Sequence, residues 1–167
     1  MARKTLMPPE KTMRIRFVWV GKTRDKSIAL LTDEYLKRIG RFSPVEISIV
    51  RELKADEADS ARIIENESEA ILRTLTRDSY AVLLDIEGKE FTSPALAKFL
   101  EDRQADGTKE LVFIIGGFLG VSVHLKESVR RRMSLSRLTL THEMARVILA
   151  EQIYRGFTIL HGLPYQK

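Results

Sequence analysis

The sequence predicts a single α/β domain with a mainly parallel sheet flanked by helices. Three observations predict this class: strand-like and helix-like segments alternate five times, no repeat or second composition regime interrupts them, and two candidate strands are continuously apolar. With 167 residues the chain can bury one sizeable core. We expect the domain to span residues 13–167, and residues 1–12, which show no periodicity, to be a flexible N-terminal extension.

The first half of the chain contains two strand–helix units and a third strand. Residues 13–20 (MRIRFVWV) turn from alternating to fully apolar, which predicts a strand, and apolar residues at helical spacing follow until Gly40. Residues 45–49 alternate as a second strand before a charged helix at about 56–75. Residues 80–86 (YAVLLDI) predict a strand that is covered on both faces.

The second half repeats the alternation. Ser93 is the expected cap of a helix that starts with Pro94 and runs to about residue 104. Residues 111–115 (LVFII) predict a buried strand, and a short helix (HLKESVRRR) follows it. A fifth strand is expected at 137–140, and the last long helix at 142–159.

Composition and charge exclude several classes of protein. Without cysteine there is no disulfide or thiolate metal site, and no apolar run reaches the roughly 20 residues of a membrane span. The start of the chain lacks the apolar core of a secretory signal, so we expect a cytoplasmic protein. The net charge of +5 is uneven, with +6 in residues 1–26, −6 in 27–125 and +5 in 126–167, which suits either a polyanionic partner or simple solvation.

A ligand is expected at the carboxyl ends of the strands, as is usual in open α/β sheets. The segment IIGGFLG (114–120) places three glycines after a buried strand, where they allow close approach of a ligand or form a turn. It matches neither the dinucleotide nor the Walker pattern. Asp85 either binds a ligand hydroxyl or, more commonly for such residues, forms a turn.

Charged residues in the second half also allow two interpretations. The arginines at 130–132 suit phosphate binding or a solvated helix end. The three histidines lack metal-ligand spacing, so no metal is expected. Arg146 and Arg155 lie nine residues apart and therefore on opposite sides of the last helix, whose apolar width favours packing in a homodimer.

In combination, three segments carry a resemblance to a known family: IIGGFLG, LSRLTLTHEMARVILAEQIYRGF and the tail LPYQK. Together with RFVWVGKT, DEYLKRI and LLDIEGKEFTSPALA upstream, they make the chain from residue 13 resemble the YbeA-type SPOUT methyltransferases, the family of large-subunit ribosomal RNA (pseudouridine-N3)-methyltransferase H. The resemblance implies a C-terminal trefoil knot, a homodimer and methylation of N3 of a pseudouridine in large-subunit (23S) RNA of the assembled ribosome.

The same resemblance implies S-adenosyl-L-methionine as cofactor and assigns residues to its site. The cofactor would lie against Leu84, Gly116, Gly117, Leu135, Ser136, Arg137, Leu138, Thr139 and Leu140.

For the chemistry, a group is needed that removes the imide proton or stabilises the resulting anion. Arg155 is the first candidate, followed by His142, Arg146 and Tyr165, and RNA binding is assigned to Arg146, Arg130, Arg131 and Lys22. In one departure from the family pattern, Gln166 stands where the family has a histidine, and glutamine does not titrate near neutral pH. Two alternatives stay open: a transfer RNA target, or a ribosome-binding module without catalysis.

Overall fold

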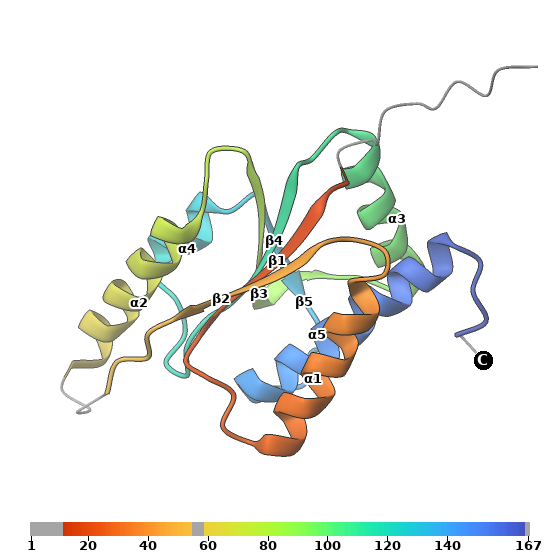
Figure 1. The fold of residues 1–167 in the computed structure, drawn as a ribbon. Coiled ribbons are helices and arrows are strands. Elements are labelled where there is room, and N and C mark those ends of the chain that lie inside the picture. The colour runs from red at the N-terminus through yellow and green to blue at the C-terminus, as the bar shows by residue number, and fades with distance from the viewer. Residues whose placement is uncertain (1–11, 55–58, 166–167) are drawn as a thin grey trace, which may run out of the picture.

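The computed structural model in Figure 1 describes residues 12–54 and 59–165. Its strands are β1 (Arg14–Val20), β2 (Val45–Val50), β3 (Ser79–Glu90), β4 (Glu110–Ile115) and β5 (Arg131–Ser134). Its helices are α1 (Lys26–Ile39), α2 (Ser60–Thr74), α3 (Ser93–Ala105), α4 (Val123–Ser128) and α5 (His142–Leu160). The predicted extension, apart from Thr12, and Gln166 lie outside the described residues.

The five strands form one parallel sheet in the order β2-β1-β4-β3-β5. Helices α1, α3 and α5 cover one face, while α2 and α4 cover the other (Figure 1). Parallel neighbours require crossover connections, and the helices in these connections bury both faces of the central strands. The predicted α/β class with a parallel sheet is therefore confirmed, while the trefoil knot stays a prediction.

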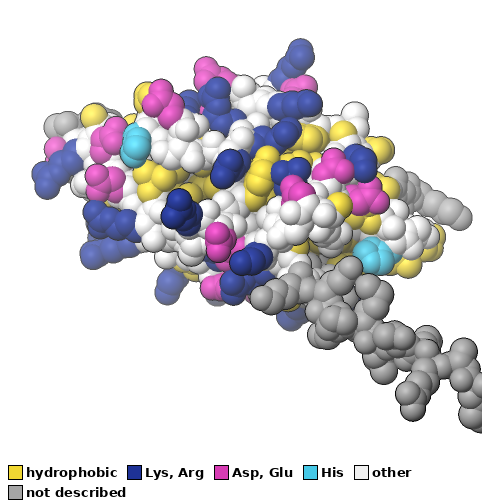
Figure 2. All heavy atoms as spheres, turned by 90° about the horizontal axis from the view of Figure 1, so that it is seen from above, with side chains coloured by type: hydrophobic (Ala, Val, Ile, Leu, Met, Phe, Trp, Pro, Cys, Tyr) yellow, Lys and Arg dark blue, Asp and Glu magenta, His cyan; other side chains and the backbone are white. Residues whose placement is uncertain are grey.

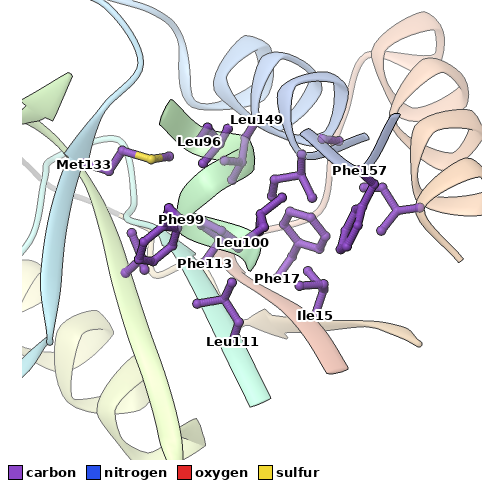
Figure 3. Packing of buried hydrophobic residues seen from close by; sticks show 14 of the residues in the cluster. Ile15, Phe17, Leu96, Phe99, Leu100, Leu111, Phe113, Met133, Leu149 and Phe157 are labelled. Carbon is purple, nitrogen blue, oxygen red and sulfur yellow. The ribbon is translucent and has the colours of Figure 1, made fainter. Parts of the chain in front are cut away.

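The larger core lies between the sheet and helices α3 and α5 (Figure 3). Phe17 of β1 and Phe113 of β4 stack with their ring centroids 6.1 Å apart. Leu149 and Phe157 of α5 have no exposed surface and pack into the same cluster. In the sequence, the wide apolar surface of this last helix favoured a dimer interface. Much of that surface is covered within one chain, because α5 contacts both α1 and α3.

The fifth strand is β5, and the strand predicted at residues 137–140 is wrong. β5 pairs with β3 and places Met133 beside Leu84. Only Met133 and Ser134 of β5 are buried, which is too short a run to predict a strand. The three consecutive arginines at 130–132 instead made the segment resemble a solvated helix end. Residues 137–140 form a loop that leads to α5.

Two further boundaries differ from the sequence prediction. The N-cap of α3 is Thr92, whose hydroxyl accepts a hydrogen bond from the Ala95 amide (3.2 Å), and not Ser93. Ser93 is the first helical residue and donates to Gln152 of α5 (2.7 Å). Strand β3 continues to Glu90, past the end predicted near residue 86, because its pairing with β5 resumes after an irregular segment.

Candidate functional site

The carboxyl ends of β3 and β4 meet the loop after β5, which brings together the residues predicted to bind the cofactor. Leu84 lies where the regular pairing of β3 with β5 ends, and Gly116 and Gly117 follow β4 directly. Residues 135–140 continue from β5 to the start of α5. The three segments come from distant parts of the chain, and the parallel sheet places their starting points at one end.

Gly116 and Gly117 are tightly surrounded. A Cβ atom on Gly116 would overlap Val121, and one on Gly117 would overlap the Oε2 atom of Glu67. The next glycine of the segment, Gly120, has a φ of 97° and donates to the Gly117 carbonyl (3.1 Å), which closes the turn. Close packing therefore requires glycine at 116 and 117, and the turn requires it at 120. Because these residues have no side chains, a ligand can approach their backbone closely.

Glu67 is a buried carboxylate behind this turn. It lies on α2, is 4% exposed and accepts a hydrogen bond from the Leu53 amide (2.9 Å). Burial raises the pKa of its carboxyl, the Leu53 hydrogen bond opposes that rise, and the charge of Glu52 adds to it. Sequence reasoning missed Glu67, although its spacing of four residues from Ile63 and Ile71 puts it on the buried stripe of α2.

Asp85 forms a turn, as the more common interpretation of the sequence predicts. Its Oδ1 atom accepts a hydrogen bond from the Glu87 amide (3.1 Å), and Lys126 and Arg132 lie 3.5 Å and 3.2 Å from Oδ2. Burial opposes ionisation, but the Glu87 hydrogen bond and the two cations outweigh it and lower the pKa of the Asp85 carboxyl. Asp85 is thus occupied with holding the end of β3 against α4 and β5.

The loop at residues 135–140 is ordered by its own serines. The Ser134 hydroxyl donates to the Ser136 carbonyl (3.0 Å), and the Ser136 hydroxyl accepts from the Leu138 amide (2.9 Å). Arg137 is exposed and pairs with Glu90 (3.3 Å), and the Leu138 side chain is 76% exposed. An exposed leucine held on a fixed turn is suited to contact with an apolar ligand surface.

Arg155 and Tyr165 lie together at the other end of α5. The Arg155 Nε atom donates to Glu151 (3.0 Å), and its guanidinium lies 4.8 Å from the centroid of the Tyr165 ring. The Tyr165 hydroxyl donates to Glu151 (3.2 Å) and lies 3.3 Å from the Tyr35 hydroxyl. The sequence signal for Glu151 is its spacing of four residues before Arg155, which is typical of a helical ion pair.

The charge states of this cluster follow from these contacts. The hydrogen bond to Glu151 raises the pKa of Arg155, so its guanidinium stays positive. Burial raises the pKa of Tyr165, and the contacts with Tyr35 and Glu151 raise it further. Tyr165 therefore stays protonated at neutral pH and can donate a hydrogen bond, but it is poorly suited to remove a proton.

His142 and Lys22 lie at the carboxyl end of β1. His142 is the first residue of α5, and the neighbouring Glu143 accepts from the Arg24 amide (2.7 Å), which holds this helix end on the loop after β1. Lys22 is exposed and lines an open hollow of about 510 Å³ at the ends of β1 and β2. His142 precedes Arg155 by thirteen residues, which is about 20 Å along a helix.

Arg146 is buried, and its predicted contact with RNA conflicts with this placement. It has no exposed surface, donates to the Val20 carbonyl (2.7 Å) and to the Thr23 hydroxyl (2.8 Å), and lies 4.9 Å from the centroid of the Trp19 ring. A side chain enclosed in this way supports the end of β1 and is not available to a phosphate.

Arg130 and Arg131, the other two predicted RNA-binding residues, are separated from Lys22. Arg130 is exposed near the amino ends of β3 and β4, and Arg131 is half-buried with its guanidinium 5.2 Å from the centroid of the Phe99 ring. The four predicted positions therefore do not form one patch on a single chain.

Neither a metal site nor a membrane span is found in the part of the chain that the structure describes. Residues 12–54 and 59–165 contain no group of three or more His, Cys, Asp or Glu residues that could hold a metal ion. Over the same ranges, no helix is long and apolar enough to cross a membrane.

The fold and the candidate site define a class: an α/β protein with a three-layer architecture and a glycine-rich turn at the carboxyl ends of a parallel sheet, where ligands of such sheets commonly bind. The family model described as "Predicted SPOUT methyltransferase" matches residues 13–166. The chain belongs to the SPOUT methyltransferase family.

Two relatives are similar to this chain over nearly their whole length. "Ribosomal RNA large subunit methyltransferase H" of Geotalea daltonii is 43% identical over 153 residues, which cover 92% of this chain and 99% of the relative. The protein of the same name from Oenococcus oeni is 38% identical over 159 residues, covering 93% and 99%.

A solved structure supports the fold alone. The crystal structure of a "putative methylase family protein" from Neisseria gonorrhoeae superposes with a TM-score of 0.56 at 15% identity, over 89% of this chain and 86% of that one.

Proposed function

We propose that this protein uses S-adenosyl-L-methionine to methylate N3 of a pseudouridine in large-subunit ribosomal RNA of the assembled ribosome. The observation that carries the proposal is the near full-length similarity to relatives named as ribosomal RNA large subunit methyltransferase H, within a methyltransferase family. Such an enzyme works where ribosomes are, which fits the predicted cytoplasmic location.

The residues at the ends of β3, β4 and β5 fit the cofactor. Gly116 and Gly117 offer a close-packed backbone that no side chain of their own shields, and exposed Leu138 offers an apolar surface to an adenine ring. We assign cofactor binding to these residues together with Leu84, Leu135, Ser136, Arg137, Thr139 and Leu140. The bound cofactor supplies a methyl group already activated on a sulfonium, so the protein mainly has to align the acceptor nitrogen.

Arg155 is proposed to stabilise the negative charge that develops when the imide nitrogen loses its proton. Its guanidinium stays positive, and stacking on Tyr165 and the bond to Glu151 hold it in one orientation. Tyr165 is assigned a hydrogen-bonding role in positioning the nucleotide, since its hydroxyl stays protonated. His142, half-buried at the start of α5, is the remaining candidate in this set for handling the proton.

A second copy of the chain is proposed to complete the site. His142 and Arg155 mark opposite parts of α5, about 20 Å apart, whereas both would have to lie near one nucleotide. In a homodimer packed about a twofold axis, the Arg155 end of one α5 can face the glycine turn of the other chain.

The experiment combines calorimetry with methyl transfer in one preparation. S-adenosyl-L-methionine is titrated into the purified protein, and radiolabelled methyl transfer is then measured to intact ribosomes, separated subunits, free ribosomal RNA and transfer RNA. We expect saturable binding and transfer to intact ribosomes. Transfer to transfer RNA alone would establish the first alternative, and ribosome binding without cofactor binding would establish a non-catalytic module.

A further inference from the structure

A second hollow lies at the end of the sheet opposite to the cofactor-binding residues. It has a volume of about 420 Å³ and is formed by the turns that lead into β3 and β4 and by the residue before β5. Figure 2, which views the molecule from the top of Figure 1, shows Lys and Arg side chains spread over this end, with apolar and acidic groups between them.

Basic side chains from four separate segments line this hollow. They are Arg77 before β3, Arg103 of α3, Lys109 before β4 and Arg130 before β5. Three of these four residues lie in the segment 27–125, whose net charge is −6. They are far apart in the sequence, and the fold brings them together around the hollow. The side chains of Arg77, Lys109 and Arg130 are exposed, so a ligand that covers the hollow from the solvent side can contact them.

The acidic groups nearby are already paired. Asp106 pairs with Arg103 (3.0 Å), and Asp78 lies 3.8 Å from Lys109. Glu110, beneath the hollow, is held by Arg16 (3.1 Å). Within the described residues, neither Arg77 nor Arg130 is in an ion pair, so both guanidinium groups are available to a phosphate.

We propose that this hollow is a second RNA-contacting surface, which binds backbone phosphates of ribosomal RNA away from the reacting nucleotide. This inference rests on the proposed function, and it identifies a second region of the protein that contacts the ribosome. Arginine guanidinium groups match phosphate oxygens in bidentate geometry, and cations converging from separate loops suit a continuous polyanion. The hollow is open, as contact with a long RNA backbone requires, and the backbone amide of Arg130 is anchored to the Ala81 carbonyl (3.1 Å), which fixes its base.

The test compares two pairs of substitutions that remove the same charge. The variant Arg77→Gln/Arg130→Gln removes the two arginines that are in no ion pair, and the control Arg41→Gln/Arg62→Gln removes two exposed arginines outside the hollow. Binding to ribosomes is measured over a salt series. We expect the first variant to bind about tenfold more weakly than the control at 0.1 M salt, with a slope of log K against log salt reduced by roughly 1.5. Cofactor binding should not change in either.

The outcomes separate this inference from the proposed function. If the unsubstituted protein binds the cofactor and methylates ribosomes while the variant matches the control, only the second surface is overturned. If the unsubstituted protein does not bind ribosomes, both proposals fall. A photo-crosslinking residue at Gln104, next to Arg103 in the last turn of α3, should label RNA. Labelling of a ribosomal protein alone would overturn the inference in favour of an acidic protein partner.

Discussion

At the scale of single residues, Gly117 and Glu67 restrict each other. The Glu67 carboxylate fills the space that a side chain at 117 would need, and the Leu53 amide prevents it from turning away freely. Position 117 therefore requires glycine because the Glu67 carboxylate leaves no room for a Cβ atom. Its backbone conformation does not require glycine, since its φ is not positive.

Gly117→Ala is expected to displace Glu67 and disturb the glycine turn that we propose binds the cofactor. Overpacking of this kind costs about 1–3 kcal/mol of unfolding free energy, and cofactor affinity should fall by about tenfold or more. Denaturant unfolding and calorimetry measure the two effects. In the double variant Glu67→Ala/Gly117→Ala the overlap is absent, so the losses should be less than additive. Strictly additive losses would mean that the two residues do not contact each other in this way.

Arg155→Ala is expected to leave folding and cofactor affinity close to normal and to lower turnover by about 100-fold, because it removes the group that we propose stabilises the developing charge. The ion pair with Glu151 is partly buried, but as an i,i+4 pair on one helix it adds only a few tenths of a kcal/mol, roughly, to stability. Arg38→Ala is a matched control, since Arg38 pairs with Glu34 and lies near the Tyr35 ring in the same way, but on α1. Methyl transfer and thermal unfolding are measured together, and unfolding of Arg155→Ala would identify a structural residue instead.

At the scale of elements, periodicity and turn chemistry predicted most of the sheet. The apolar strands β1, β3 and β4 and the helices around them follow directly from their spacing. The short strand β5 could not be predicted, because its burial depends on pairing with β3 and not on local pattern. The glycine turn could be predicted because its three glycines are neighbours in the sequence. The burial of Arg146 could not be predicted, because it depends on Trp19, which lies 127 residues away.

The link between β3, α4 and β5 should depend on pH through Asp85. Its pKa is lowered in the folded state, so its contribution to stability is present above its ordinary value of 3.8 and is lost as the pH falls through the folded value. We expect Asp85→Asn to lower the unfolding free energy by about 1 kcal/mol at pH 7, with a difference that shrinks below about pH 4. Asp33→Asn, at an exposed site, is the control, and a difference independent of pH would contradict the prediction.

At the scale of the whole molecule, a composite site in a homodimer can be tested by mixing defects. Gly117→Ala and Arg155→Ala chains, each impaired alone, are co-expressed, and the purified dimers are assayed at a cofactor concentration that does not saturate Gly117→Ala. If the cofactor turn and Arg155 of one site come from different chains, each mixed dimer has one intact site. Random pairing should then restore about a quarter of the methyl transfer. No recovery would mean that both groups act within one chain.

The order of strands in the sheet also bears on how the chain is made. Phe17 of β1 stacks on Phe113 of β4, a partner synthesised 96 residues later, and β1 pairs with no strand other than β2 and β4 in the described residues. Contacts this distant in sequence slow folding, because a long loop must close first. During translation, the apolar side chains of β1 therefore stay without their main partner until β4 has left the ribosome. Premature termination before β4 should yield an aggregation-prone chain and not a smaller folded unit.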